Sequence, residues 1–383
     1  MTGADANRPR VLFVGRARLR YPLSHGLERR YQALSGELDW LQLGTAASGR
    51  SSRDSRFVLA RPFPIKVLDG PVYHLELPLR VARELRAFEP DAVIVQGAQE
   101  TALTLLGRRL ARSQAVVVLD LHGDWHVPTR LYGSWGRRLL NPLADALARI
   151  ALRQADGVRT ISSYTTELVR GEGIEPTAEF PAYMDLERFT AYPVAPLPVA
   201  PRALFIGVLE RYKAFDVLLD AWWLVTAQSP DAVLHIVGDG TLAPLAARLV
   251  EELPGRVEWD TVLGADEVAA ALDASTILVL PSRSEGMGRV IIEAACRGRG
   301  VVGSRVGGIP DVVTDGETGL LVPPGDPQAL ADPLAGVLSD RAVAERLGAA
   351  ARIAVEPWLA TPEEYAHRVR ALVEKVVASA TAD

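Results

Sequence analysis

Two glutamates, Glu285 and Glu293, stand eight residues apart in the chain and flank a glycine-rich turn. An apolar run at 276–280 precedes the turn and is typical of a buried parallel strand, and the residues after the turn start a helix. Open α/β sheets bind ligands at such strand-to-helix turns. Free N–H groups and the positive end of the helix dipole favour a phosphate there, while an acid on each side can bind hydroxyls. A nucleotide-sugar has that order of groups: sugar, diphosphate and ribose.

The elements that must position this turn form two similar α/β halves. In each half, short apolar runs alternate with segments of helical periodicity, which predicts parallel sheets with right-handed crossovers. The predicted strands lie at 11–15, 92–96, 115–119, 157–161, 203–207, 233–238, 276–280 and 300–303, and helices are expected near 24–34 and 141–155. Four prolines within 192–201 predict a stiff connector between the two halves.

The domain organisation follows from this pattern and from the length of 383 residues, which is too long for one ordinary core. A first Rossmann-like domain is predicted for residues 1–195 and a second for residues 196–360. The segment 361–364 reads Thr-Pro-Glu-Glu, a capping box with proline at the first helical position. It predicts a terminal helix over about 361–383.

The bulk composition is that of an ordinary globular enzyme, with 48% hydrophobic and 23% charged residues. The single cysteine, Cys296, excludes an internal disulfide and suits a reducing compartment. No apolar run approaches the roughly 20 residues of a membrane span, and the N-terminus lacks a signal-peptide core. We therefore expect a cytoplasmic protein.

The charge is spread unevenly along the chain. Residues 1–190 contain 26 Lys and Arg against 21 Asp and Glu, whereas the remainder contains 16 against 26. A basic first half suits peripheral contact with an anionic membrane face, here the inner membrane surface, or an acidic acceptor. A solvated, arginine-rich surface explains the same excess.

Later blocks complete a family pattern around the acid pair. Residues 306–311 read Val-Gly-Gly-Ile-Pro-Asp, and residues 315–326 begin Asp-Gly-Glu-Thr-Gly. In this order the blocks resemble those of the retaining glycosyltransferases of family 4, and the resemblance is strongest over 281–326. It implies the GT-B fold, in which two Rossmann-like domains of parallel sheet face a deep interdomain cleft and a C-terminal helix returns to the first domain.

The resemblance also implies roles for the motif residues on the donor side. Glu293 would bind the ribose hydroxyls, Glu285 would act at the transferred sugar, and Lys213 would contact the diphosphate. Fixed N–H dipoles in the turn would stabilise the charge that develops on the leaving diphosphate. The donor-binding residues implied in this way are Gly207, Arg211, Lys213, Leu263, Gly286, Met287, Gly288, Arg289 and Glu293.

Two positions depart from the family pattern. The family commonly has an arginine directly after the glycine at 207, but this chain has Val208, and Arg211 in the same loop is the candidate replacement. Where the family usually has Asn-Gly, this chain has Ala182 and Tyr183. These departures leave the details of phosphate binding open.

A histidine follows the predicted strand at 115–119. The segment 119–124 reads Leu-Asp-Leu-His-Gly-Asp and resembles the family's histidine loop, which implies that His122 faces the donor sugar and acts with Glu285 as a catalytic residue. A histidine there can hydrogen-bond a sugar hydroxyl, and its backbone carbonyl can stabilise positive charge near the anomeric carbon. A lone histidine is often structural, but its place at the carboxyl end of a strand favours a function.

The N-terminal segment from Arg16 to Arg30 is expected to be a loop that faces the acceptor. It contains five arginines, and a phosphate or carboxylate on the acceptor would suit them, although ordinary surface arginines explain them equally. The predicted acceptor-side residues are Gly15, Arg16, His25 and Gly26.

Together, these features predict a retaining, hexosyltransferase-type enzyme that moves a sugar from a UDP- or GDP-sugar to an acceptor hydroxyl, in glycan or glycoconjugate biosynthesis. The acceptor is left open between a glycan, a lipid-linked sugar and a small metabolite. No cofactor is expected, and no metal, because the chain has no Asp-x-Asp motif and no Cys/His cluster with zinc spacing. No nucleic-acid-binding face is evident.

Two alternatives stay open from the sequence. One is a GT-B sugar-nucleotide epimerase, since an epimerase would bind the same donor. The other is a nucleotide-sugar-binding protein without catalysis, which the departures at Val208, Ala182 and Tyr183 would permit.

Overall fold

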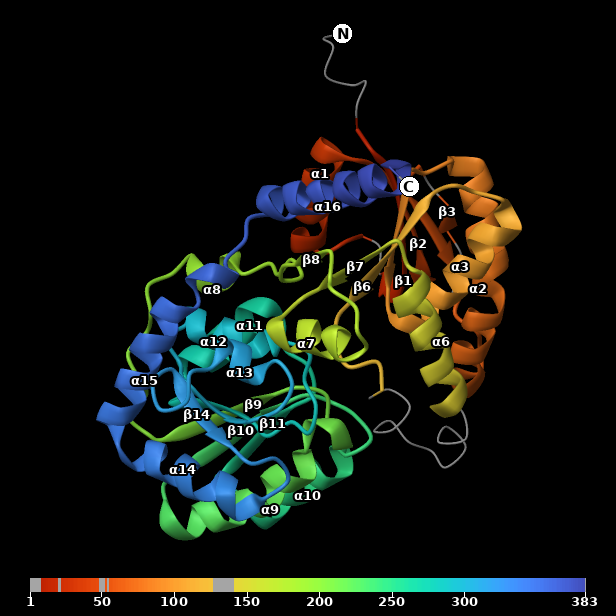
Figure 1. The fold of residues 1–383 in the computed structure, drawn as a ribbon. Coiled ribbons are helices and arrows are strands. Elements are labelled where there is room, and N and C mark those ends of the chain that lie inside the picture. Colours follow the sequence, from red (N-terminus) through yellow and green to blue (C-terminus); the bar gives the residue numbers. More distant parts are fainter. Residues whose placement is uncertain (1–7, 20–21, 48–51, 54, 127–140, 383) are drawn as a thin grey trace. The chain divides into compact units, whose positions relative to one another are not determined.

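A computed structural model describes residues 8–19, 22–47, 52–53, 55–126 and 141–382. The described residues form two compact units, each built around one sheet with helices on it (Figure 1). The first unit contains the described residues up to 126, then 141–183 and 360–382, and the second contains 184–359. Nearly all neighbouring strands are parallel, so the predicted α/β class with two Rossmann-like sheets is confirmed.

The described part of the first sheet has eight strands in the order β3-β4-β2-β1-β5-β6-β7-β8, parallel except for β3 and β4. The strands are β1 (Arg10–Leu19), β2 (Asp39–Ala46), β3 (Ser52–Arg53), β4 (Phe57–Ala60), β5 (Ala92–Gln96), β6 (Val116–Leu121), β7 (Gly157–Thr160) and β8 (Ala178–Glu179). The chain first adds strands on one side of β1 and then on the other, so its order reverses between β1 and β5. The carboxyl ends of β1 and β5 form the switch point where open α/β sheets bind ligands.

Helices cover both faces of the first sheet. They are α1 (His25–Glu37), α2 (Lys66–Phe88), α3 (Ala98–Ala111), α6 (Asn141–Gln154), α7 (Ser163–Gly171) and α16 (Pro362–Ala382). Successive strand side chains point to opposite faces. Val11 therefore lies in a core cluster with Leu34 of α1 and Val373 of α16, whereas its neighbour Leu12 lies in another with Leu77 of α2. The predicted return of the C-terminal helix to the first unit is thus seen in the core.

The second sheet has six strands in the order β11-β10-β9-β12-β13-β14, all parallel. They are β9 (Arg202–Ile206), β10 (Val233–Val237), β11 (Val257–Asp260), β12 (Ile277–Leu280), β13 (Val301–Ser304) and β14 (Gly319–Val322). The helices are α8 (Glu187–Thr190), α9 (Phe215–Gln228), α10 (Ala243–Glu252), α11 (Ala265–Asp273), α12 (Arg289–Cys296), α13 (Ile309–Val312), α14 (Pro327–Ser339) and α15 (Arg341–Ala354), with short 3₁₀ turns η1 (Arg211–Lys213) and η2 (Glu356–Trp358). Fully buried Phe205, Phe215 and Trp222 anchor the core between β9 and α9.

The N-terminal segment differs from the expectation of a loop between Arg16 and Arg30. Strand β1 continues to Leu19, because the residues after Val14 pair again with β2 beyond a register shift. Arg16 therefore belongs to a strand, whereas His25 and Gly26 open helix α1, which confirms the helix predicted near 24–34. The expected loop was wrong for residues 16–19 because their polar side chains hide the continued pairing.

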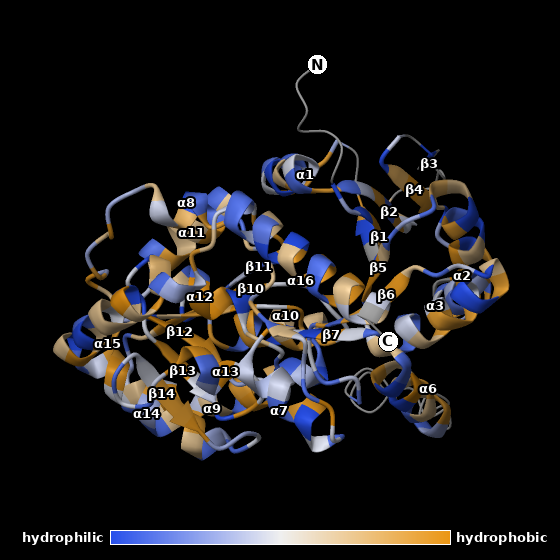
Figure 2. Cartoon of the chain, turned by 45° about the horizontal axis from the view of Figure 1, so that its top comes forward, coloured by the Kyte–Doolittle hydropathy of each residue, from blue (hydrophilic) through white to orange (hydrophobic). Residues whose placement is uncertain are grey.

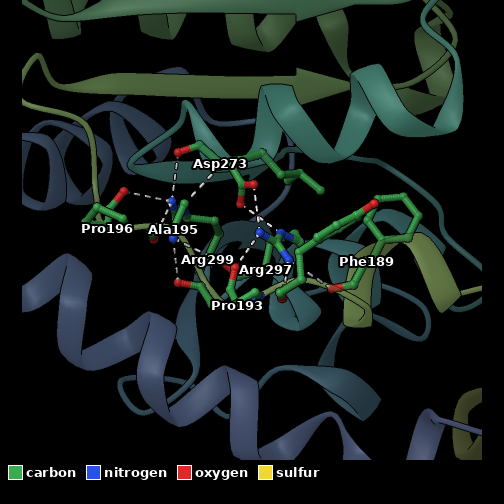
Figure 3. A network of polar contacts seen from close by, with 10 residues as sticks. Phe189, Pro193, Ala195, Pro196, Asp273, Arg297 and Arg299 are labelled. Atoms are coloured by element: carbon green, nitrogen blue, oxygen red, sulfur yellow. Dashed lines mark hydrogen bonds and ion pairs between the residues drawn. The ribbon is translucent and has the colours of Figure 1, made fainter.

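The proline-rich connector is anchored to the second unit by three arginines, Arg297, Arg299 and Arg341. Their guanidinium groups donate to the carbonyls of Phe189, Tyr192 and Pro193 (Arg297), Ala195 and Pro196 (Arg299), and Leu197 and Pro198 (Arg341). Figure 3 shows Arg297 and Arg299 side by side between these carbonyls and Asp273. The carbonyl groups of such a connector have no hydrogen-bond donors within the connector itself. The arginines supply these donors and so fix the segment.

We predict that Arg299→Met lowers the free energy of unfolding of the second unit by about 3 kcal/mol. Arg299 is only 2% exposed and donates to several buried carbonyls, which would lose their partner. Urea unfolding followed by tryptophan fluorescence measures the change. Arg248→Met, which removes an exposed pair with Glu252, serves as the control and should cost less than about 0.5 kcal/mol. Equal effects of the two substitutions would contradict the anchoring role.

Candidate active site

The turn that contains Glu285 lies at the carboxyl end of β12 and leads into α12. Gly288 has a φ of +78°, a left-handed conformation that favours glycine and ends the turn at the helix. Behind the turn, a Cβ on Gly307 would overlap the carbonyl oxygen of Glu285, and one on Gly308 would overlap that of Gly286. Gly308 N–H also donates to the Glu285 carbonyl at 3.0 Å. The glycine pair after β13 therefore holds the acid turn by close backbone contact.

Glu285 and Lys213 form an ion pair at this edge of the sheet. Lys213 Nζ donates to Glu285 Oε2, and the two side chains are only 14% and 15% exposed. Ser282 Oγ donates to the same oxygen at 3.4 Å, and Lys213 Nζ lies 5.5 Å from the centre of the Tyr212 ring. The two motif residues that the sequence assigned to sugar and diphosphate are thus in direct contact.

A second ion pair ties the lysine loop to the acid turn. Arg283 binds both carboxylate oxygens of Asp216, at 2.7 and 2.9 Å, and also donates to the carbonyl of Arg211 at 2.6 Å. Arg283 N–H donates to the carbonyl of Tyr212 at 2.7 Å. Between them, Ala214 has a φ of +51°, which is costly for a residue with a side chain. Arg283 and Asp216 therefore hold the loop in the conformation that places Lys213.

Glu293 is buried in the second turn of α12. Its residue is 8% exposed, and Oε1 accepts from Arg289 Nε at 2.7 Å, one helical turn away. Burial raises the pKa of Glu293, and the charge of Arg289 offsets only part of this effect. The carboxylate therefore keeps unused affinity for hydrogen-bond donors, as a group that binds ribose hydroxyls would.

Backbone N–H groups at the start of α12 are left without acceptors in the described part of the chain. Within the described ranges, the N–H groups of Met287, Gly288 and Arg289 have no acceptor in the structure. They stand at the positive end of the helix dipole, between Glu285 and Glu293. An anion such as a diphosphate is favoured there.

The loop after β9 is shaped by a second close backbone approach. A Cβ on Gly238, whose φ is +153°, would overlap the carbonyl oxygen of Gly207. Leu209 N–H donates to the Asp239 carbonyl at 3.0 Å, and Glu210 accepts from Thr241 N–H at 3.0 Å. This packing fixes the segment that carries Lys213 against the turn after β10.

Two predicted donor residues, Arg211 and Leu263, stand apart from the ion pairs, as does Val208, where the family arginine is missing. Val208 is 44% exposed, and Arg211, whose side chain is exposed, makes no ion pair in the part of the chain that the structure describes. Leu263 is half-buried in the loop that leads from β11 into α11, at the same edge of the sheet. The replacement of the missing arginine by Arg211 stays a prediction.

In the first unit, His122 directly follows β6 and is held by a buried charge pair. His122 Nε2 lies 2.9 Å from Asp120 Oδ2, and Asp120 Oδ1 accepts from the fully buried Arg159 at 2.6 Å. Burial would raise the pKa of Asp120, but Arg159 and His122 outweigh it and hold the pKa well below its usual range. Gln96 Nε2 lies 3.2 Å from His122 Nδ1. The ionised Asp120 therefore accepts from Nε2–H and fixes the ring.

The predicted acceptor-side residues are only partly brought together. A Cβ on Gly15 would lie 3.4 Å from Gln96 Oε1, so Gly15 borders the switch point between β1 and β5. Arg16 lies 3.4 Å from Asp69 of α2, which also binds Arg18 at 2.7 Å. His25 is exposed and Gly26 is buried at the start of α1, and neither contacts this group.

A cavity of about 170 Å³ opens beside Asp69. It lies at the carboxyl ends of β2 and β4, and its lining combines polar residues such as Thr45, Glu76 and Arg80 with apolar and aromatic ones such as Phe63 and Tyr73. This mixture of donors and acceptors suits a ligand rich in hydroxyl groups. Across the described residues there is no group of three or more His, Cys, Asp or Glu that could hold a metal ion.

Sequence reasoning missed Asp216, Arg283, Gln96 and Arg159. A signal existed for three of them. Arg159 is a charged residue in an otherwise apolar strand, which indicates a buried partner, and Asp216 and Arg283 have opposite charges in or next to two motif blocks. Gln96 carried no signal, because the sequence does not show that β5 and β6 are neighbours.

Two family models together match most of the chain. Residues 24–182 match the model described as glycosyl transferase 4-like domain, and residues 200–340 match the model described as glycosyl transferases group 1. The chain belongs to the group 1 glycosyltransferases. This membership agrees with the family 4 resemblance of the sequence and with the GT-B fold.

Curated relatives of this glycosyltransferase chain support the same family. A sulfoquinovosyl transferase of Arabidopsis thaliana is 27% identical over 324 residues, which are 79% of this chain and 61% of the relative. A D-inositol 3-phosphate glycosyltransferase of a Nocardioides species is 33% identical over 226 residues, which are 54% and 49% of the two chains. The chain thus spans about half to three fifths of the length of these relatives.

Solved structures show the same fold across the whole chain. A sucrose-phosphate synthase from Thermosynechococcus elongatus has a TM-score of 0.76 at 21% identity and covers 97% of this chain and 100% of its own. The Anabaena protein HepE in complex with UDP-glucose has a TM-score of 0.69 at 18% identity, with coverage of 97% and 100%.

We predict that Arg283→Met and Asp216→Asn each raise the donor KM by about tenfold, with a smaller effect on kcat, because the loop that carries Lys213 is released. The double variant should be no worse than either single one, since both remove the same pair. Steady-state kinetics at varied donor concentration measure the effect. Arg202→Met, which removes a comparable pair with Glu258 at the other end of β9, is the control and should leave KM unchanged. Additive effects of the first two substitutions would refute the shared role.

Glu293 gives a prediction about pH. Its raised pKa means that the folded protein keeps this proton at a higher pH than the unfolded chain, whose value is near 4.5. Stability due to Glu293 is therefore lost as pH rises from about 4.5 through the raised pKa. In Glu293→Gln, we expect the melting temperature relative to wild type to increase over this interval, while affinity for the nucleotide falls by about tenfold.

Differential scanning calorimetry between about pH 4.5 and pH 7.5 and nucleotide titration calorimetry measure the two effects of Glu293→Gln. Glu252→Gln changes an exposed helical acid that is also paired one turn away, and it is the matched control. A melting temperature that is lowered equally at every pH would contradict the raised pKa, because it would mean that the carboxyl group has the same pKa in the folded and the unfolded chain.

Proposed function

We propose that the chain is a retaining glycosyltransferase that transfers a sugar from a UDP- or GDP-sugar to an acceptor hydroxyl. The observation that carries the proposal is the Glu285–Lys213 pair and the buried Glu293, together with the N–H groups between the two acids in the chain, which have no acceptor among the described residues. Glu285, the N–H groups and Glu293 follow one another in the same order as the sugar, the diphosphate and the ribose of a nucleotide-sugar. Family membership supports the reaction class.

For the donor, we propose that Lys213 leaves Glu285 when a diphosphate arrives and neutralises its charge. The N–H groups of Met287, Gly288 and Arg289 then bind the diphosphate oxygens, and Glu293 exchanges Arg289 for ribose hydroxyls. Glu285, freed of its lysine, accepts hydrogen bonds from the sugar. The complex of HepE with UDP-glucose makes a UDP-sugar the first donor to test.

For the chemical step, we propose attack from the face on which the diphosphate departs, with a phosphate oxygen taking the acceptor proton. In this scheme Glu285 accepts hydrogen bonds from the sugar, and the attack needs no covalent intermediate on its carboxylate. His122 would bind a substrate hydroxyl through Nδ1 in place of Gln96, since Asp120 holds Nε2 and fixes the orientation of the ring. No metal and no cofactor are required by this scheme.

For the acceptor, we propose a glycan, a lipid-linked sugar or a small metabolite that bears hydroxyl groups. The cavity beside Asp69, lined by Tyr73 and Arg80, supports a polyhydroxylated group of about one sugar ring. Relatives include enzymes named for D-inositol 3-phosphate, which is a phosphorylated polyol. Arg16 and Arg18 are candidates for an anionic substituent on the acceptor.

The test combines binding and turnover. UDP- and GDP-sugars are screened by thermal stabilisation, where a ligand at 100 times its dissociation constant adds about 2.7 kcal/mol. With the stabilising donor, Glu285→Gln should lower transfer by at least about 100-fold while nucleotide affinity changes by less than about threefold. Glu267→Gln, which alters an exposed acid at the start of α11, is the control and should leave both unchanged.

Three further readouts separate the proposal from its alternatives. Proton NMR of the product should show the same anomeric configuration as the donor, and chelation by EDTA should leave the rate unchanged. Isomerised donor in the absence of acceptor would indicate an epimerase. Tight donor binding with neither transfer nor slow hydrolysis would indicate a binding protein and overturn the proposal.

A further inference from the structure

One surface of the first unit is unusually apolar. Nine of the seventeen exposed large hydrophobic residues in the described chain lie between 63 and 150. They are Phe63, Ile65, Leu68, Leu75, Leu79, Leu106, Leu110, Leu143 and Ile150. Leu75 is 79% exposed and Leu79 is 69% exposed, so these side chains stand almost free in water. Apolar surface gathered in this way marks an interaction site.

Seven of these residues lie on three neighbouring helices. Helix α3 packs against α2 on one side and α6 on the other, and all three cover the same side of the first sheet (Figure 1). We call their outer surface the α2–α3–α6 face; its apolar members are Leu68, Leu75 and Leu79 of α2, Leu106 and Leu110 of α3, and Leu143 and Ile150 of α6. In Figure 2 these helices carry hydrophobic residues among hydrophilic ones.

The exposed apolar residues of this face are separate from the residues with which each helix packs into the core. Helix α2 buries Tyr73, Leu77 and Val81 against the sheet, and Leu75 and Leu79 point the other way because they are offset by two residues. An ordinary surface helix has polar residues at such positions. The core therefore does not explain the leucines.

Charge on the same face is strongly one-sided. The exposed basic residues of the three helices and their C-caps are Arg83, Arg86, Arg109, Arg112, Arg149 and Arg153, whereas the exposed acids are Glu76 and Glu89. The acids Asp69 and Glu84 of α2 are buried and paired with arginines. The face thus combines exposed apolar side chains on three adjacent helices with an excess of arginine.

We propose that the α2–α3–α6 face binds the surface of an anionic lipid bilayer. Leucine side chains on helices that lie along an interface enter the boundary of the acyl chains, and arginines beside them meet the acidic head groups. A second copy of the chain is a poorer occupant, because a two-fold contact would bring the two basic faces together. No helix in the described ranges is long and apolar enough to cross a membrane, so the contact is peripheral.

Sedimentation of the full chain with sucrose-loaded vesicles tests the proposal. Wild type should sediment with vesicles of phosphatidylcholine and phosphatidylglycerol at low salt, less with phosphatidylcholine alone, and less as salt rises. Leu75→Ser combined with Leu79→Ser should weaken binding by about tenfold or more. Arg83→Gln with Arg149→Gln and Arg153→Gln should weaken binding to the anionic vesicles by about fivefold for each arginine, with little effect on neutral ones.

Matched controls lie in the second unit. Ile353→Ser alters a residue that is 72% exposed on α15, and Arg248→Gln removes an exposed arginine on α10; both should bind as wild type does. Circular dichroism and melting temperature show that each variant is folded. The assay needs no turnover, so its outcome is independent of the proposed transfer reaction.

Three results would overturn the proposal. Wild type could remain in the supernatant with anionic vesicles at low salt. The leucine variant could bind as strongly as wild type. Light scattering could show a dimer that the substitutions at Leu75 and Leu79 dissociate, which would assign the face to a second copy of the chain.

Discussion

The candidate donor site depends on a backbone contact that leaves no space for a side chain. The carbonyls of Glu285 and Gly286 press against Gly307 and Gly308, so the acid turn is fixed from behind before any side chain acts. From the other side, Arg283 and Asp216 bring the lysine loop against the same turn. Two rigid contacts therefore place Glu285 and Lys213 within reach of each other, and a preorganised site needs this.

Both acids of the candidate donor site are paired with a cation of the same chain. Lys213 neutralises Glu285 and Arg289 neutralises Glu293, so each of these buried charges has a partner. A ligand must replace these pairs with contacts of its own. This exchange favours a donor that carries an anionic group and hydroxyls together, and it disfavours either group alone. In the first unit, Arg159 and Asp120 play a different part, since they stay paired and only orient His122.

The sequence predicted the regular parts of the fold well because buried parallel strands are short, continuous apolar runs. The strand at 92–96 and the helix over 141–154 were found almost to the residue. The acid turn was also found, since its glycines and acids are close together in the chain. Contacts between distant segments were not found, such as Asp216 with Arg283 and Gln96 with His122, because strand order is not written in local periodicity. The continuation of β1 beyond Arg16 was missed for the same reason: pairing with β2 outweighs local polarity.

The three arginines that hold the proline-rich segment have a practical consequence for anyone who wishes to isolate the second unit. A fragment that starts at the first strand of that sheet, near Arg202, would discard the carbonyls on which Arg297, Arg299 and Arg341 depend. Arg297 and Arg299 would be left as buried cations with too few acceptors, and the fragment would expose or misfold the end of α12. A fragment meant to contain the second unit should therefore begin upstream of Phe189, so that it keeps the proline-rich segment that these arginines bind.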